Sequence, residues 1–320
     1  MSYLTIIRFT YFFFAITQIL LSTLRCVEIA GIAFALSVMT LVINCTINWI
    51  LIYGHFGAPG MGAAGAAVGT LTARIVEICV LIIYISRKQG WIGIRLKDYL
   101  KTDWEFGWKY YKVVCPLLVI QGLWGVNTAL QTVILGHMTA AAIAANSAAS
   151  NLFLMVKSAA VGAASAASVT MGKTIGSGDL DLAKLYSRKL QKLFVVMGLT
   201  CGVLLFFIRI PVLSLYQLSP ETRNMANTFL IILSVVMVGM SYQMPTNGGI
   251  IRGSGSIAYS MKVDLISTWV VVIPLSAFVA FMVKASPAVV VCCLNADQIF
   301  KCVPAFIKCN YGHWIKNMTN

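Results

Sequence analysis

Residues 44–74 read NCTINWILIYGHFGAPGMGAAGAAVGTLTAR and contain two apolar runs joined by a turn rich in Gly and Pro. The first run carries two amides, Asn44 and Asn48, at i and i+4 on one helix face. The second run begins with Gly62, Gly65 and Gly69, where the backbone of another helix can approach closely. This pattern predicts a helical membrane hairpin that needs further helices as partners. Without those partners, we expect the three glycines to face lipid or a void.

The composition places the whole chain in a membrane. Of its 320 residues, 59% are hydrophobic and 11% are charged, an apolar share well above that of soluble domains. A net charge of +14 would suit a nucleic-acid-binding protein, but the basic residues lie between apolar runs and form no separate basic domain. The sequence therefore predicts contact with a lipid bilayer and no nucleic-acid partner.

Nine apolar runs are long enough to cross a bilayer as helices. They cover residues 2–22, 30–53, 63–86, 110–136, 139–171, 190–216, 224–248, 257–283 and 286–307. The expected fold class is an all-α polytopic membrane protein with nine transmembrane helices. Basic residues gather in alternate connections, at 87–112, 173–192 and 252–262. The positive-inside rule places these connections and the C-terminal tail in the cytoplasm, and the N-terminus outside.

One cationic spacing occurs twice, which indicates an internal repeat. Arg25 and Arg74 are 49 residues apart (74 − 25), and so are Arg252 and Lys301 (301 − 252). If a second repeat opens near Tyr110, the chain corresponds to the C-terminal nine helices of a twelve-helix protein built as six plus six. The expected organisation is three helices of an N-lobe at 1–86, a connection at 87–112, a six-helix C-lobe at 113–307 and a cytoplasmic tail at 308–320.

Several strings resemble the multidrug and toxic compound extrusion (MATE) family. They include CPLLVIQGLWGVN, VGAASAASVTMGKTIGSGD and MSYQMPTNGGIIRGSGS, together with the hairpin quoted above. The resemblance implies two six-helix lobes around a cleft that opens alternately to either side. It also implies exchange of organic cations for Na⁺ or H⁺, with no other cofactor. Gln121 stands where many relatives carry Glu, and Ser241 or a neighbour where some carry Asp, so the usual coupling acids are missing at these positions.

Charged residues inside the predicted spans are candidates for function because they are costly to place in lipid. Asp264 is the first candidate, as a ligand for Na⁺ or a proton, or as a contact for a cationic substrate. The alternative is that it pairs with Lys262 or Arg252 and holds a loop. Asp297 and Lys301, at i and i+4, are expected to form a structural ion pair.

Two further features complete the charged set. Arg74 and Glu77, at i and i+3, are expected to form an ion pair. Lys157 stands in the middle of an apolar run with no carboxylate within a helical turn, so its partner must come from another helix or from water.

Uncharged polar residues form stripes that could orient a substrate or ligate Na⁺ through oxygen. Helix-to-helix hydrogen bonding is the alternative role for each. These residues are Gln121, Trp124, Asn127 and Gln131; Asn146, Ser150 and Asn151; and Tyr242, Gln243 and Asn247. Pro116 and Pro245 lie beside the stripes and are expected to kink their helices.

The function predicted from these observations is secondary active antiport of organic cations across a bacterial plasma membrane, by a protein that is monomeric at full length. A lipid-linked oligosaccharide flippase of the same superfamily is the second hypothesis. The third is an integral-membrane enzyme, which would need His, Asp or Glu clustered near a membrane face, and an inactive fragment is a further possibility. The sequence offers no catalytic constellation, since its histidines lie in turns and in the tail, and no enzyme activity is predicted.

Overall fold

A computed structural model describes residues 2–26, 29, 31–57, 60–87, 104–312 and 314. The described residues fold into helices and the turns between them. The chain divides into two compact units, residues 1–109 and 110–320. Unit 1 holds the first three helices and the first residues of α5 (Trp104–Met138). Unit 2 holds the rest of α5 and the remaining helices, and each unit is described by itself.

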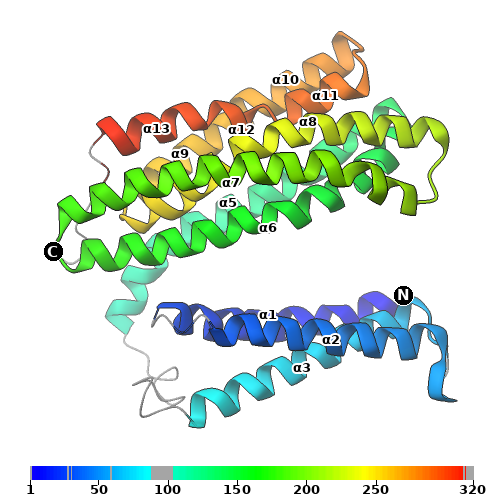
Figure 1. The fold of residues 1–320 in the computed structure, drawn as a ribbon, viewed down its shortest axis with the longest axis horizontal. Coiled ribbons are helices and arrows are strands. Elements are labelled where there is room, and N and C mark those ends of the chain that lie inside the picture. Colours follow the sequence, from blue (N-terminus) through cyan, green and yellow to red (C-terminus); the bar gives the residue numbers. More distant parts are fainter. Residues whose placement is uncertain are drawn as a thin grey trace. The chain divides into compact units, whose positions relative to one another are not determined.

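Unit 1 consists of α1 (Ser2–Cys26), α2 (Gly31–Tyr53) and α3 (Ala63–Arg87), with α3 packed against both other helices (Figure 1). A small apolar core joins them, formed by Leu20, Leu21, Leu24, Leu36, Leu81 and Ile85. The short 3₁₀ turn η1 (His55–Gly57) follows α2, and Gly54 and Gly57 adopt φ of 76° and 80° there. Such values favour glycine, which is why the Gly-rich string forms the turn.

The glycines of α3 pack against the other half of the hairpin. A Cβ at Gly65 would lie 2.8 Å from the main-chain carbonyl of Leu51, and a Cβ at Gly69 would lie 3.3 Å from the main-chain nitrogen of Asn48. Gly62 belongs to the turn, with φ of 55°. The expectation that these glycines face lipid or a void is therefore wrong for Gly65 and Gly69, because α2 itself fills that space.

Unit 2 contains six spans. The first three are single helices, α5 (Trp104–Met138), α6 (Ala140–Gly176) and α7 (Leu180–Leu215). The fourth is α8 (Pro220–Pro245) with the π-helix η3 (Thr246–Ile251). The fifth comprises α9 (Ile257–Leu265), η4 (Ile266–Val272), α10 (Ile273–Ala277) and η5 (Phe278–Met282). The last comprises α11 (Pro287–Leu294), α12 (Asp297–Phe300) and α13 (Cys302–Tyr311).

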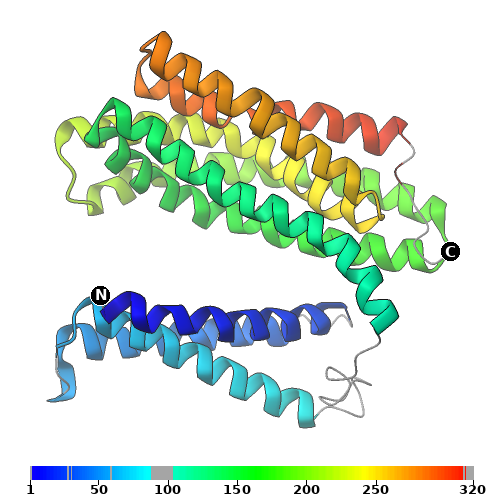
Figure 2. The same cartoon turned by 180° about the vertical axis from the view of Figure 1, so that it is seen from behind.

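Helix α8 is the centre of unit 2, in contact with α6, α7, α11, α12 and α13. Phe229, Leu230 and Met237 of α8 are fully buried in the largest apolar cluster. Close approach on one side depends on Gly202 of α7, where a Cβ would lie 2.8 Å from the carbonyl oxygen of Ser234. Figure 2 shows the opposite face, along which α5 runs. Near the end of α5, the His137 and Phe281 rings lie 4.9 Å apart.

Three spans of unit 2 are interrupted: the fifth by the π-helices η4 and η5, and the fourth and the last by two interruptions that lie near the candidate site. The π-helix η3 follows Pro245 directly, so the distortion expected at this proline begins at the next residue, Thr246. Gly249 of η3 packs on α6, where a Cβ would lie 2.8 Å from the carbonyl oxygen of Ala164. The last span breaks between Leu294 and Asp297. Both interruptions adjoin the polar residues considered below.

The nine predicted spans are confirmed among the described residues, which contain nine helical segments long and apolar enough to cross a membrane. Most of their ends differ by a few residues, and the last continues to Tyr311. The sixth span begins at Leu180, ten residues before the predicted start (190 − 180). Residues 88–103 of the predicted connection lie outside the described residues, and residues 104–112 form the start of α5.

Candidate functional site

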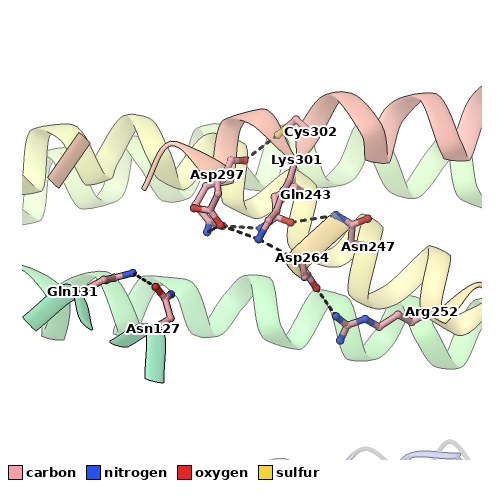
Figure 3. A network of polar contacts seen from close by, with 10 residues as sticks. Asn127, Gln131, Gln243, Asn247, Arg252, Asp264, Asp297, Lys301 and Cys302 are labelled. Carbon is pink, nitrogen blue, oxygen red and sulfur yellow. Dashed lines mark hydrogen bonds and ion pairs between the residues drawn. The ribbon is translucent and has the colours of Figure 1, made fainter. Parts of the chain in front are cut away.

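A lysine ammonium in unit 2 lies between two carboxylates from different helices. Nζ of Lys301 is 2.8 Å from Oδ2 of Asp297 and 3.2 Å from Oδ1 of Asp264 (Figure 3). The side chain of Lys301 is only 4% exposed. The predicted pairing of Asp297 with Lys301 is confirmed, and Asp264 of α9 joins it from another span. Lys301 thus links the fifth and sixth spans.

Arg252 extends this arrangement at the end of η3. Its Nη2 donates to Oδ2 of Asp264 at 2.7 Å, and its Nε donates to the Ser260 hydroxyl at 2.9 Å. The Asp264 carboxylate therefore has a cation at each oxygen. Of the two partners expected for Asp264, Arg252 is the one that it contacts, and Lys301 is an additional partner that the sequence did not indicate.

Amide side chains continue the contacts from Asp297 into α8. Nε2 of Gln298 donates to Oδ2 of Asp297 at 2.9 Å, and Nε2 of Gln243 donates to Oε1 of Gln298 at 2.7 Å. Nδ2 of Asn247 donates to Oε1 of Gln243 at 3.4 Å. We call these seven residues the polar network: Gln243, Asn247, Arg252, Asp264, Asp297, Gln298 and Lys301. It connects the last three spans of unit 2.

The local chain geometry explains how these groups meet. Asp297 opens α12 directly after the break in the last span, and Lys301 follows it by one helical turn. Gly239 lets this segment approach α8, since a Cβ there would lie 2.9 Å from the carbonyl oxygen of Gln298. The Cys302 thiol donates to the Gly239 carbonyl oxygen at 3.3 Å and reinforces the contact.

The electrostatics of the polar network are balanced internally. It contains two cations, Arg252 and Lys301, and two carboxylates, Asp264 and Asp297. Isolated charges in a bilayer are costly, whereas paired and hydrogen-bonded charges are tolerated. Within the polar network, the buried Oδ1 of Asn247 has no hydrogen-bond partner among the described residues. A buried oxygen of this kind is available to an ion or a water molecule.

Other residues predicted from the stripes lie outside the polar network. Nζ of Lys157 on α6 lies 4.7 Å from the ring centroid of Trp124 on α5. Nε2 of Gln131 donates to Oδ1 of Asn127 at 3.4 Å, within α5. In the part of the chain that the structure describes, no side-chain hydrogen bond is made by Gln121, Asn146 or Asn151, of which Gln121 and Asn151 are exposed.

Tyr242 belongs to a second cluster, on another face of α8 from Gln243. Its hydroxyl donates to Oε1 of Gln191 on α7 at 2.8 Å, and Nδ2 of Asn310 on α13 donates to the same oxygen at 3.0 Å. Adjacent residues on a helix point about 100° apart, so Tyr242 and Gln243 reach different neighbours. The structure separates residues that the sequence analysis grouped.

Three polar residues with buried contacts were absent from the predicted set. Gln191 and Gln298 are buried amides, and a search for amides within apolar runs would have found them. Arg209 of α7 is 9% exposed. Its Nε donates to Oδ1 of Asn227 on α8 at 2.9 Å, and its Nη1 donates to the Phe206 carbonyl oxygen. The signal for Arg209 was a lone cation in the apolar string FFIRIPVLSL.

The chain is similar to curated multidrug resistance proteins. It is 24% identical over 246 residues to the probable multidrug resistance protein NorM of Bacillus cereus, covering 77% of this chain and 54% of NorM. It is 21% identical over 249 residues to MdtK of Edwardsiella ictaluri, covering 78% of this chain and 54% of MdtK. The chain thus spans about half the length of the curated relatives that it matches.

Solved transporter structures share the fold. One, a multidrug resistance MATE family transporter of the MOP superfamily in an outward-facing conformation, has a TM-score of 0.83 at 18% identity and matches 96% of this chain and 68% of that chain. A mutant of the Vibrio cholerae MATE transporter VcmN has a TM-score of 0.77 at 15% identity, over 94% of this chain and 66% of that chain.

The MatE family model matches residues 116–278, which begin in α5 and end in η5. The matched range is half of the chain and includes Lys157, Gln243, Asn247, Arg252 and Asp264. This chain, a multi-pass membrane protein, therefore belongs to the MatE family, which is a family of transporters and not of enzymes.

Proposed function

We propose that this protein is a secondary active antiporter that exports organic cations in exchange for Na⁺ or H⁺. The observation that carries the proposal, beyond the family, is the polar network, which lies within the last three spans except for Arg252, directly after the fourth span of unit 2. Its charges are placed where lipid makes them costly, and they join three helices through contacts that an ion can replace. A coupling ion needs such a replaceable set of contacts.

The mechanism that we propose is competition for carboxylate oxygens. A proton or Na⁺ that binds Asp264 or Asp297 weakens the contact of that carboxylate with Lys301, which lies 3.2 Å and 2.8 Å from them. Freed contacts change which arrangement of the last two spans is favoured, so ion binding shifts the population of conformations. The unpartnered oxygen of Asn247 is an additional ligand for Na⁺.

The substrate site of the proposal comprises the residues singled out by sequence, with Gln243, Asn247 and Asp264 closest to the coupling step. The remaining members are Gln121, Trp124, Asn127, Asn146, Asn151, Lys157 and Tyr242. The protein would lie in a bacterial plasma membrane with its C-terminus in the cytoplasm, because the basic connections alternate with connections poor in Lys and Arg. We propose a monomer as the working unit of the full-length transporter.

Transport in proteoliposomes tests the proposal. Purified chain is reconstituted with a permanently cationic fluorescent dye, and a Na⁺ gradient, a pH gradient or neither is imposed. We expect the dye to move against its concentration gradient under one of the two ion gradients only. Asp264→Asn should abolish this movement, because a neutral amide at this position cannot bind a proton or Na⁺ in place of its contacts with Arg252 and Lys301.

Asp181→Asn is the matched control. Asp181 is an exposed acid at the start of α7, and its one ion pair among the described residues is with Lys184 of the same helix, at 3.4 Å. Its removal should leave gradient-driven transport unchanged. Dye movement equal to that in protein-free liposomes under both gradients would refute the proposal, whereas normal transport by Asp264→Asn would return Asp264 to a structural role.

A further inference from the structure

The chain that follows α13 turns back and buries an aromatic ring. The Gly312 main-chain N–H donates to the carbonyl oxygens of Ile307 and Lys308, at 3.1 Å and 3.2 Å, and so closes the helix. A Cβ at position 312 would lie 2.9 Å from the Lys308 carbonyl oxygen, so this close turn requires glycine. Two residues later, Trp314 is only 4% exposed. A segment outside the helices that buries so large a side chain is held in place.

Trp314 lies in an apolar cluster to which four helices contribute. Its other buried members are Ala167, Met171 and Ile175 of α6, Ala183 and Phe194 of α7, Ile250 and Ile251 of η3, and Cys309 of α13. Burial of apolar surface is the main attraction between such groups. The cluster therefore attaches the segment after the last span to three earlier elements of unit 2.

The main-chain carbonyl oxygen of Trp314 accepts hydrogen bonds from the turn between η3 and α9. The Ser256 hydroxyl lies 2.6 Å from this oxygen and the Ser254 hydroxyl lies 2.9 Å from it. Both serines are buried. A hydroxyl has one proton to donate, and the Ser254 hydroxyl also lies 2.8 Å from the Ile251 carbonyl oxygen. Ser256 is therefore the steadier of the two donors.

The same turn begins with Arg252 of the polar network. Arg252 donates to Asp264 at 2.7 Å, and Asp264 contacts Lys301 of the last span at 3.2 Å (Figure 3). The segment at Trp314 follows that last span directly. The contacts thus form a closed ring, which runs from the turn through Asp264 to the last span, along α13, and back to the turn through Trp314.

We propose that Trp314 is a positioning residue, which acts as a strap on the turn at residues 252–256 and so keeps Arg252 on the Asp264 carboxylate. Its effect on transport rests on the proposed antiport, in which the coupling ion competes with Arg252 for that carboxylate. The described charged groups around Asp264 are Arg252 and Lys301, with Asp297 beyond Lys301. Release of the strap lets the turn move, which weakens one competitor and leaves the carboxylate more open to the ion.

Trp314→Ser tests the strap by hydrogen exchange and by transport. In the purified chain in lipid nanodiscs, amide exchange in peptides covering residues 252–265 should become about tenfold faster, because the turn loses an attachment. In proteoliposomes, the concentration of the driving ion that gives half-maximal transport should fall about threefold, with the maximal rate unchanged. A purely structural role would lower the maximal rate without changing that concentration.

Three further variants separate the strap from a general folding defect. Trp314→Phe keeps an apolar ring and the carbonyl oxygen, so it should retain the values of the unmodified chain. Ser256→Ala removes one donor and should shift both measurements in the same direction by a smaller factor. Tyr311→Ser is the matched control, because Tyr311 lies in the same segment and is 81% exposed, and it should change neither measurement. The fold should survive Trp314→Ser, because the turn also packs on α6, where a Cβ at Gly253 would lie 2.9 Å from Cα of Ser168.

The two measurements fail independently. Exchange at residues 252–265 that is no faster in Trp314→Ser than in Tyr311→Ser overturns the strap, whatever transport shows. Faster exchange with an unchanged half-maximal ion concentration overturns the positioning role. Absence of ion-driven transport by the unmodified chain overturns the antiport, and hydrogen exchange then still decides whether the strap holds the turn.

Discussion

Units 1 and 2 each contain a pair of cations 49 residues apart, but the two pairs make different contacts. In unit 2, Asp264 contacts both members, Arg252 at 2.7 Å and Lys301 at 3.2 Å. In unit 1, Arg25 donates to the Leu21 carbonyl oxygen at 3.3 Å, and Arg74 pairs instead with Glu77 of its own helix at 2.6 Å. The shared cation spacing therefore does not impose a shared network.

The difference lies on the intervening helix. Asp264 follows Arg252 by 12 residues, and the residue at the same distance from Arg25 is Ser37. Ser37 is exposed and donates to the Ala33 carbonyl oxygen of its own helix at 2.9 Å. Unit 1 consequently joins α2 to α3 by close glycine packing and by the bond from Asn44 to the Thr70 hydroxyl at 3.3 Å. Unit 2 joins its last spans through charges, which an ion can rearrange.

The largest effect should come from removing the central cation of unit 2. Lys301→Met leaves the buried carboxylate of Asp297 and the half-buried carboxylate of Asp264 without their shared ammonium. Breaking a buried ion pair, as between Lys301 and Asp297, costs about 3–5 kcal/mol of unfolding free energy. Unfolding of the purified chain in mixed micelles measures the loss. Lys189→Met is the control and should change stability little. A loss no greater than that of the control would contradict a network held together by Lys301.

A smaller effect is expected in unit 1 from Glu77→Gln. Glu77 is buried, but Arg74 is 28% exposed and its Cζ also lies 5.0 Å from the Phe14 ring centroid. The guanidinium keeps this second contact and can reach water, so we expect a loss of about 1–2 kcal/mol in the same assay. A loss as large as that of Lys301→Met would show that the ion pair of unit 1 stabilises the protein as much as the polar network of unit 2 does.

The smallest effect is expected from Arg25→Gln, compared directly with Arg252→Gln. Within the described part of the chain, the hydrogen bonds of Arg25 go to two uncharged oxygens, the second being Oε1 of Gln18 at 3.5 Å. Its removal should therefore cost below about 1 kcal/mol. Arg252 donates to a carboxylate, and its removal should cost about 1.5–3 kcal/mol. Hydrogen exchange of backbone amides, measured separately for peptides of each unit, gives the stability loss that each of the two substitutions causes in its own unit. Equal losses of stability in the two variants would show that the contact between Arg252 and Asp264 does not stabilise unit 2.

Much of the fold could be predicted from the sequence, because hydropathy over a span is a local property. The nine spans, the turn after Tyr53 and the pairs Arg74–Glu77 and Asp297–Lys301 all follow from residues close in sequence. The packing of Gly65 against Leu51 was missed because the sequence shows that a close approach is possible, but not which helix makes it.

The candidate site was less accessible to sequence reasoning. The bond between Gln243 and Gln298 joins residues 55 apart, and the contact of Lys301 with Asp264 depends on how two spans are rotated about their axes. That rotation is set by packing and by the π-helical turns, which shift the side chains that follow them. For the same reason, Tyr242 was grouped with Gln243 although it faces Gln191.

The contact between Gly65 and Leu51 has an evolutionary consequence. Gly65 would clash through any Cβ, whereas Leu51 meets it mainly with main-chain atoms that every residue possesses. At this helix crossing, selection therefore constrains the residue at position 65 but not the side chain at position 51. Position 65 should remain glycine among related sequences, while position 51 is free to drift among apolar residues, so covariation between the two should be weak even though they touch.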